Sequence, residues 1–130
     1  MGEDVKKLRI HSGRKLFGSL QICSSKNAIL PLLAGSLLCS GAVQLNKVPN
    51  FDDVSNPCKI LAELGADVKK QDDVLIVDAS VADKYFVPNA LGKDLRASIV
   101  FVGALLAKFR FAIVGYPGGC NIGARPINLH

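Results

Sequence analysis

The sequence predicts an α/β (α+β) fold built from similar modules, and three observations lead to this prediction. Short alternating stretches, typical of strands, follow longer apolar stretches with helical spacing. A shift along the chain superposes two helix-then-strand units. The chain has 130 residues, of which 49% are apolar, which suits one domain with a core and excludes a disordered tail.

The first third of the chain predicts strands and then a helix. Residues 8–23 alternate between apolar and polar and predict two short strands with a turn near Ser12-Gly13. Residues 24–41 predict a helix whose N-cap is Ser24 or Ser25. Pro31 is awkward inside this helix, because proline beyond the first turn kinks a helix.

A glycine and a strand follow the predicted helix. Gly41 is the expected helix stop, and residues 42–49 alternate as a strand. Residues 28–45 are apolar over most of their length, but a bilayer span needs about 20 mostly apolar residues, and Ser, Gln, Pro and Gly interrupt the stretch. We therefore expect a buried core helix and no membrane span.

The middle of the chain repeats this order. Residues 51–66 predict a helix that has Asp52 and Asp53 near its start and Gly65 at its end. Residues 67–80 predict a hairpin that turns at residues 71–73.

After a loop, the last third predicts one more helix and strand. Residues 93–109 form the expected helix and residues 110–117 the expected strand. The internal repeat appears when the chain is shifted so that Gly35 falls on Gly103. The seven matched pairs are Gly35/Gly103, Leu37/Leu105, Leu38/Leu106, Val43/Phe111, Leu45/Ile113, Val48/Tyr116 and Pro49/Pro117. Duplication of one helix-then-strand unit explains this ordered match.

Charge and cysteine content exclude several function classes. The net charge is +5, but the basic residues form scattered pairs and aromatic residues are few, so we expect no nucleic-acid interface. A small anionic substrate suits this charge equally well. Four cysteines lack CxxC spacing and two histidines lie at opposite ends, so we expect no metal site. We expect Cys39, and with it Cys23, to be packing residues among apolar neighbours.

The first ten residues lack the apolar core of a signal peptide. We therefore expect a cytoplasmic, reducing location with free thiols.

Lys26 and Asn27 lie side by side at a predicted helix start, where backbone N–H groups and the helix dipole favour an anion. Arg96 lies near the start of the duplicated helix, so both cations could converge on one phosphate-bearing ligand. From these residues alone, a solvated lysine and a capping asparagine explain Lys26 and Asn27 better than an anion site does, and an exposed arginine explains Arg96 equally well.

Cys120 lies in a glycine-rich loop, five residues before Arg125. Glycines permit close approach of the backbone to a ligand, and a nearby cation lowers a thiol pKa. These features favour a nucleophile or a proton donor over an ordinary surface cysteine.

Five stretches together resemble the bacterial UDP-N-acetylglucosamine 1-carboxyvinyltransferases, a family of enolpyruvyl transferases: PGGCNIGARPINLH, SSKNAILPLLAGSLL, KVPNFDDV, LAELGADV and LRASIVFVGALLA. The resemblance runs from about Leu8 to His130. The sister enolpyruvyl transferase of aromatic amino-acid synthesis shares the fold but lacks the cysteine loop.

The resemblance implies transfer of the enolpyruvyl group of phosphoenolpyruvate to a sugar hydroxyl of UDP-N-acetylglucosamine, with release of phosphate. This reaction opens peptidoglycan precursor synthesis and needs no cofactor. The implied fold is an incomplete inside-out barrel of βαβαββ-type modules. Residues 1–25 would supply strands to a second domain, and residues 26–130 would form part of the first domain.

The resemblance also implies roles for individual residues. Cys120 corresponds to the general acid that protonates the methylene carbon of phosphoenolpyruvate, which can form a covalent adduct and is alkylated by fosfomycin. Lys26 and Asn27 match a Lys-Asn pair at the phosphoenolpyruvate site. Ser24 stands where the family usually has glycine.

The UDP-sugar contacts are implied in the same way. Arg96 matches an arginine that binds the UDP-sugar, and Arg125 matches one that binds both phosphoenolpyruvate and the UDP-sugar. The remaining implied UDP-sugar contacts are Pro126, Ile127, Asn128 and Leu129. Asn128 replaces the usual aspartate, so that position has lost its charge.

Members of the family are several times longer and have two domains around a cleft. We therefore expect the isolated chain to lack turnover, because the second half of the site is missing, and to self-associate through exposed apolar surface. The alternative is a non-catalytic relic or fragment with at most weak UDP-sugar or anion binding.

Overall fold

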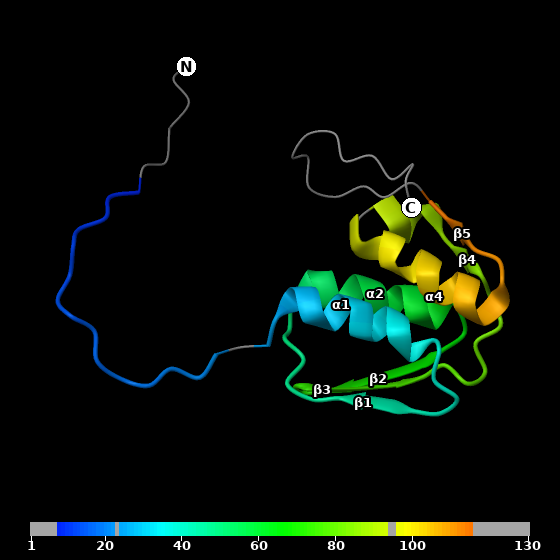
Figure 1. The fold of residues 1–130 in the computed structure, drawn as a ribbon, viewed down its shortest axis with the longest axis horizontal. Coiled ribbons are helices and arrows are strands. Elements are labelled where there is room, and N and C mark those ends of the chain that lie inside the picture. Colours follow the sequence, from blue (N-terminus) through cyan, green and yellow to red (C-terminus); the bar gives the residue numbers. More distant parts are fainter. Residues whose placement is uncertain (1–7, 23, 94–95, 116–130) are drawn as a thin grey trace, which may run out of the picture.

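The computed structural model describes residues 8–22, 24–93 and 96–115. It has mixed helices and strands, which confirms the predicted fold class. A layer of helices, α1 (Lys26–Ser36), α2 (Asp52–Glu63) and α4 (Val100–Phe109), covers one face of a three-stranded sheet. Figure 1 shows this layer above the sheet, with a second, two-stranded pair at the side of the helices.

The three-stranded sheet consists of β1 (Val43–Leu45), β2 (Asp67–Gln71) and β3 (Val74–Asp78) in the order β1-β3-β2. Both pairings are antiparallel. The predicted hairpin is therefore confirmed, and the predicted strand after the first helix is confirmed over three residues. Asp72 has a φ of 51° in the turn, a left-handed conformation that aspartate tolerates better than most residues.

The core lies between the helices and the sheet. α2 was predicted nearly to its bounds, and Gly65 just past its end has a φ of 97°. Its apolar side chains meet those of α1, α4 and β3 in one cluster that is closed to solvent. The fully buried leucines and isoleucine of this cluster are Leu33, Leu37, Ile60, Leu61, Leu64, Leu75 and Leu105.

The two-stranded pair joins β4 (Phe86–Val87) to β5 (Ile113–Val114), which run parallel. The crossover between them passes through α3 (Asn89–Lys93), η1 (Arg96–Ile99) and α4. The single helix predicted over residues 93–109 is therefore wrong in detail, because a 3-10 turn precedes α4. β4 lies in a stretch that we expected to be a loop.

α1 ends earlier than predicted. Gly41 is not the helix stop, because α1 ends at Ser36 and its C-cap is Leu37. The N–H groups of Leu37 and Leu38 bond to carbonyls three residues back, at 3.2 and 3.0 Å. This tighter turn ends the α-helix while leaving Leu37 fully buried. Pro31 lies inside α1, and the helix continues beyond it.

Residues 8–22 form no strand, so the strand pair predicted over residues 8–23 is not found among the described residues. In Figure 1 this segment, drawn in blue, extends away from the helices and sheets. Its apolar side chains are almost fully exposed, for example Leu16 at 96% and Phe17 at 90%. A strand requires hydrogen-bonding partners, and these residues find none within the described chain. That they join a second domain remains a prediction.

The internal repeat is visible in burial. Leu37 and Leu105 are both fully buried, whereas Leu38 and Leu106 are both about half exposed, at 54% and 47%. The two copies differ in length and pairing, because α4 continues to Phe109 and β5 pairs in parallel while β1 pairs antiparallel. None of the described helices is long and apolar enough to cross a membrane.

Candidate functional site

The first turn of α1 exposes backbone donors beside a cation. Ser25 is the N-cap, with extended backbone angles, which confirms one of the two predicted caps. Its carbonyl accepts the first helical hydrogen bonds, from the N–H groups of Ala28 and Ile29 at 3.2 Å each. Its side chain makes no capping bond within the described structure. The amides of Lys26 and Asn27 thus precede the helical ladder, in the position where a helix start binds anions.

Lys26 reaches across to the start of the neighbouring helix. Its Nζ lies 2.6 Å from Oδ2 of Asp53, and both side chains are about half exposed, at 48% and 45%. This ion pair joins the first turn of α1 to the first turn of α2. We predicted Asp53 only as part of a helix start. The sequence does place a basic residue at the start of one helix and an acidic residue at the start of the next. The ion pair between them nevertheless depends on how the two helices pack.

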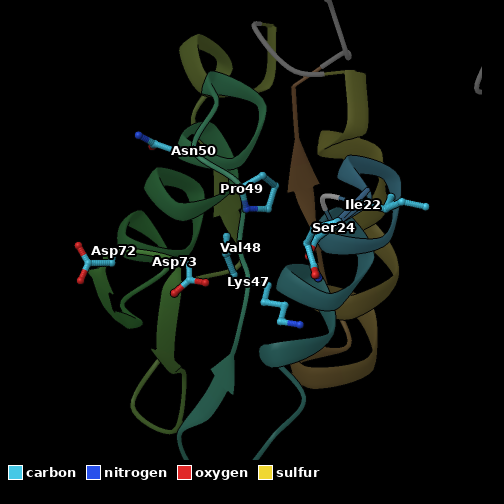
Figure 2. Close-up of a pocket in the computed structure, with 9 residues that line it drawn as sticks. Ile22, Ser24, Lys47, Val48, Pro49, Asn50, Asp72 and Asp73 are labelled. Atoms are coloured by element: carbon cyan, nitrogen blue, oxygen red, sulfur yellow. The ribbon is translucent and has the colours of Figure 1, made fainter. Parts of the chain in front are cut away.

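A cavity of about 720 Å³ lies beside the α1 start (Figure 2). On one side it is bounded by Gln21, Ile22 and Ser24, and on the other by residues 47–50 and the β2–β3 turn. The N–H of Val48 donates to the carbonyl of Asp73 at 2.7 Å, which ties these two boundaries together. The described lining residues are Gln21, Ile22, Ser24, Lys47, Val48, Pro49, Asn50, Asp72 and Asp73.

A smaller cavity of about 350 Å³ adjoins the α1 start between α1 and the end of β1. Ser24 and Lys47 line both cavities. Lys47 has a φ of 57°, and Figure 2 shows its side chain extending between the loop and α1. Ser24 and Lys47 therefore bring a hydroxyl and an ammonium group to the cavities beside the α1 start. The acidic residue Asp73 also lines the larger cavity, while Asp72 in Figure 2 points away from Lys47.

The other predicted site residues are only partly placed. Arg96 begins η1, and its side chain lies outside the described part of the structure. Cys120, Arg125, Pro126, Ile127, Asn128 and Leu129 lie outside the described residues. The convergence of Arg96 on the α1 start therefore remains a prediction, as does the role of the cysteine loop.

Two described cysteines are free thiols with different surroundings. Cys39 is exposed, so its predicted packing role is wrong. Cys58 lies half-buried against β2 and β3, and this burial raises its thiol pKa above the ordinary value of 9.0, although Lys70 partly opposes the shift. A raised pKa disfavours the reactive thiolate. Cys58 is therefore unsuited to act as a nucleophile near neutral pH.

Comparison with known proteins agrees with the architecture. The sequence of residues 10–130 matches the family described as EPSP synthase (3-phosphoshikimate 1-carboxyvinyltransferase). A UDP-N-acetylglucosamine 1-carboxyvinyltransferase of Shewanella amazonensis is 46% identical over 126 residues, and one of Cellvibrio japonicus is 43% identical over 127 residues. Each alignment covers 97% of this chain and 30% of the relative, so the chain spans under a third of their length.

A solved structure shares the fold. The enolpyruvyl transferase NikO from Streptomyces tendae superposes with a TM-score of 0.64 and 22% identity, over 77% of this chain and 23% of that one. The incomplete sheets of the present structure are consistent with part of such a domain. The match over residues 10–130 places the chain in the EPSP synthase family of enolpyruvyl transferases.

Proposed function

We propose that this chain is part of an enzyme that transfers the enolpyruvyl group of phosphoenolpyruvate to UDP-N-acetylglucosamine in peptidoglycan synthesis. The main support is the pair of relatives named for this carboxyvinyl transfer, which align with nearly the whole chain. In the reaction a bond forms between the sugar oxygen and the enolpyruvyl carbon, the carbon–oxygen bond to phosphate breaks, and the hydroxyl proton leaves with phosphate.

Lys26 and Asn27 are the proposed phosphoenolpyruvate ligands. Support comes from the α1 start, where an ammonium group and amides outside the helical ladder lie together. Lysine supplies a point charge for a phosphate, and asparagine supplies a donor and an acceptor. Arg125 is proposed to bind the same phosphate and the UDP-sugar. Arg96 and residues 126–129 are proposed as further UDP-sugar contacts.

Cys120 is the proposed proton donor to the methylene carbon of phosphoenolpyruvate. The methyl group formed in this way loses a proton again when phosphate leaves, so the transferred enolpyruvyl group keeps its methylene. Incubation with fosfomycin and UDP-N-acetylglucosamine, followed by peptide mass spectrometry, tests this role. We expect an adduct on Cys120 and none on Cys39, which is exposed and serves as the internal control thiol. Equal modification of both thiols, or none at Cys120, would count against this role of Cys120.

The isolated 130-residue chain is proposed to be inactive. Its alignment with 30% of each relative supports this, because a two-domain site would lack its second wall and the base that takes the hydroxyl proton. A phosphate-release assay with both substrates checks it. Steady release above the rate of a Cys120→Ser control would contradict the proposed inactivity.

A non-catalytic fragment or relic with weak anion binding is the second candidate. The exposed cation at the α1 start supports binding of this kind even without turnover. Binding of UDP-N-acetylglucosamine without any fosfomycin adduct on Cys120 would favour this candidate over the first.

Self-association is also proposed. Six large apolar side chains of residues 8–22 are exposed, and such surfaces associate in water. Light scattering across a concentration series should show growth in mass. A strictly monomeric species at high concentration would exclude it.

A further inference from the structure

The Lys26–Asp53 ion pair lies inside the proposed anion site, and the proposed function gives Asp53 no role. Lys26 is the first residue of α1 and Asp53 the second residue of α2, so the pair links the first turns of two packed helices. Any anion held by Lys26 therefore lies within a few ångströms of a carboxylate. Opposite charges at this separation attract, and like charges repel by a similar amount.

The geometry leaves room for an anion while the pair exists. A lysine ammonium carries three N–H donors, and the described bond to Oδ2 of Asp53 uses one of them. Lys26 remains 48% exposed, so the other two donors are open to solvent. A half-exposed ion pair contributes little to stability, which makes a purely structural role for Asp53 a weak explanation.

The carboxylate lowers the net charge seen by a ligand. An isolated lysine carries one positive charge, whereas the net charge of the Lys26–Asp53 pair is close to zero. A phosphate group bound at this lysine is thus held less tightly than the amides and ammonium alone would hold it. For a site that must bind one phosphate-bearing substrate and release inorganic phosphate after each turnover, weaker retention speeds release.

We propose that Asp53 is an internal counter-anion that competes for Lys26 and weakens phosphate retention at the α1 start. This inference rests on the proposed function, because it takes Lys26 as the phosphate ligand. Asp53 acts through Lys26 and does not itself bind substrate, so it is a positioning residue. Its removal is expected to raise affinity for phosphate, an effect that damage to the fold does not produce.

The test is titration of the full 130-residue chain with inorganic phosphate at constant ionic strength, followed through the backbone amide ¹⁵N–¹H resonances of residues 26 and 27, which every variant retains. Asp53→Asn keeps the size of the side chain and removes its charge. We expect this variant to bind phosphate about fivefold more tightly or better, the ratio that one unit charge about 4 Å away gives in water. Lys26→Met should abolish binding at this position, alone or combined with Asp53→Asn.

Asp52→Asn is the matched control. Asp52 carries the same charge in the same turn of α2 and is exposed, but the ion pair with Lys26 is made by Asp53. We expect this variant to change phosphate affinity much less than Asp53→Asn does. An equal gain in phosphate affinity would show that any negative charge at the start of α2 has this effect. That result would overturn the specific role of Asp53.

The possible results distinguish a failure of the Asp53 role from a failure of the proposed anion site. If phosphate binds through Lys26 and Asp53→Asn binds it equally or more weakly, Asp53 is not a competitor, while the proposed anion site stands. If no variant binds phosphate at Lys26, the proposed site fails and the inference fails with it.

Discussion

The rings of Tyr85 and Phe111 meet edge to face, with their centroids 5.2 Å apart and their planes at 87°. Tyr85 precedes β4 and Phe111 lies two residues before β5, and the N–H of Ile113 donates to the carbonyl of Tyr85 at 3.0 Å. The contact between the two half-exposed rings therefore adds a side-chain interaction beside the short parallel pairing of these strands.

Separating these rings should cost a measurable but small amount of stability. Aromatic pairs contribute about 0.5–1.5 kcal/mol beyond burial, so a double-mutant cycle of Tyr85→Leu and Phe111→Leu should give a coupling energy in that range. Urea unfolding monitored by circular dichroism provides the four stabilities. Tyr85→Phe is the control, because it keeps both rings. A coupling energy of zero would show that the edge-to-face contact contributes nothing to stability.

The repeated leucines should respond alike in the two halves of the repeat. Leu37→Ala and Leu105→Ala each remove a fully buried side chain, so each should lower the free energy of unfolding by about 2–5 kcal/mol. Leu38→Ala and Leu106→Ala alter half-exposed side chains and should cost under about 1 kcal/mol. Denaturant titration compares all four. A large loss at Leu38 or Leu106 would mean that the matched burial is not energetically equivalent.

Two glycine-to-alanine substitutions should change the stability of the fold in opposite directions. Gly65 has a φ of 97°, and an added Cβ would lie 3.3 Å from Oδ1 of Asp83 and 3.4 Å from Cα of Ala82. Gly65→Ala should therefore destabilise the fold by about 1–2 kcal/mol. Gly103, inside α4, has open space around its Cβ position, so Gly103→Ala should stabilise by about 0.5–1 kcal/mol. Thermal melting of the two variants distinguishes these effects, and shifts of the same sign would contradict the assignment.

The Cys58 thiol should resist alkylation and weaken the fold at high pH. Because burial raises its pKa in the folded chain above 9.0, the folded state keeps a proton that the unfolded state loses. Its contribution to stability is complete below pH 9.0 and falls as pH rises through the folded pKa. Cys58→Ser should flatten this alkaline loss in unfolding experiments.

Alkylation gives a second reading of the same thiol. At pH 8, iodoacetamide should modify Cys58 several-fold more slowly than the exposed Cys39, as followed by peptide mass spectrometry. Equal rates at the two positions would indicate that Cys58 is not shielded in solution.

Elements specified by neighbouring residues were predictable from the sequence. The β2–β3 hairpin follows from alternation around one short turn, and α2 follows from acidic residues at its start and Gly65 after its end. β4 could not be predicted, because two residues carry little pattern and its partner strand lies far along the chain. The strands predicted within residues 8–23 failed for a related reason, since a suitable pattern forms no strand without a partner.

The candidate site was predictable only in its local parts. Lys26 and Asn27 were identified because a helix start and a cation can be read from adjacent residues. The Lys26–Asp53 pair was missed because it depends on how α1 packs against α2, which no local pattern specifies. The cavity bounded by residues 47–50 and the β2–β3 turn likewise arises from a tertiary hydrogen bond, between Val48 and Asp73.

The parallel pairing of β4 with β5 bears on the order in which the chain folds. The β2–β3 hairpin closes over a two-residue turn, and hairpins of this kind form within about 1–10 μs. β4 and β5 instead pair only after the crossover through α3, η1 and α4 has formed. Such non-local contacts form late in folding. We expect hydrogen exchange to protect the hairpin amides first during refolding, and the amide of Ile113 among the last.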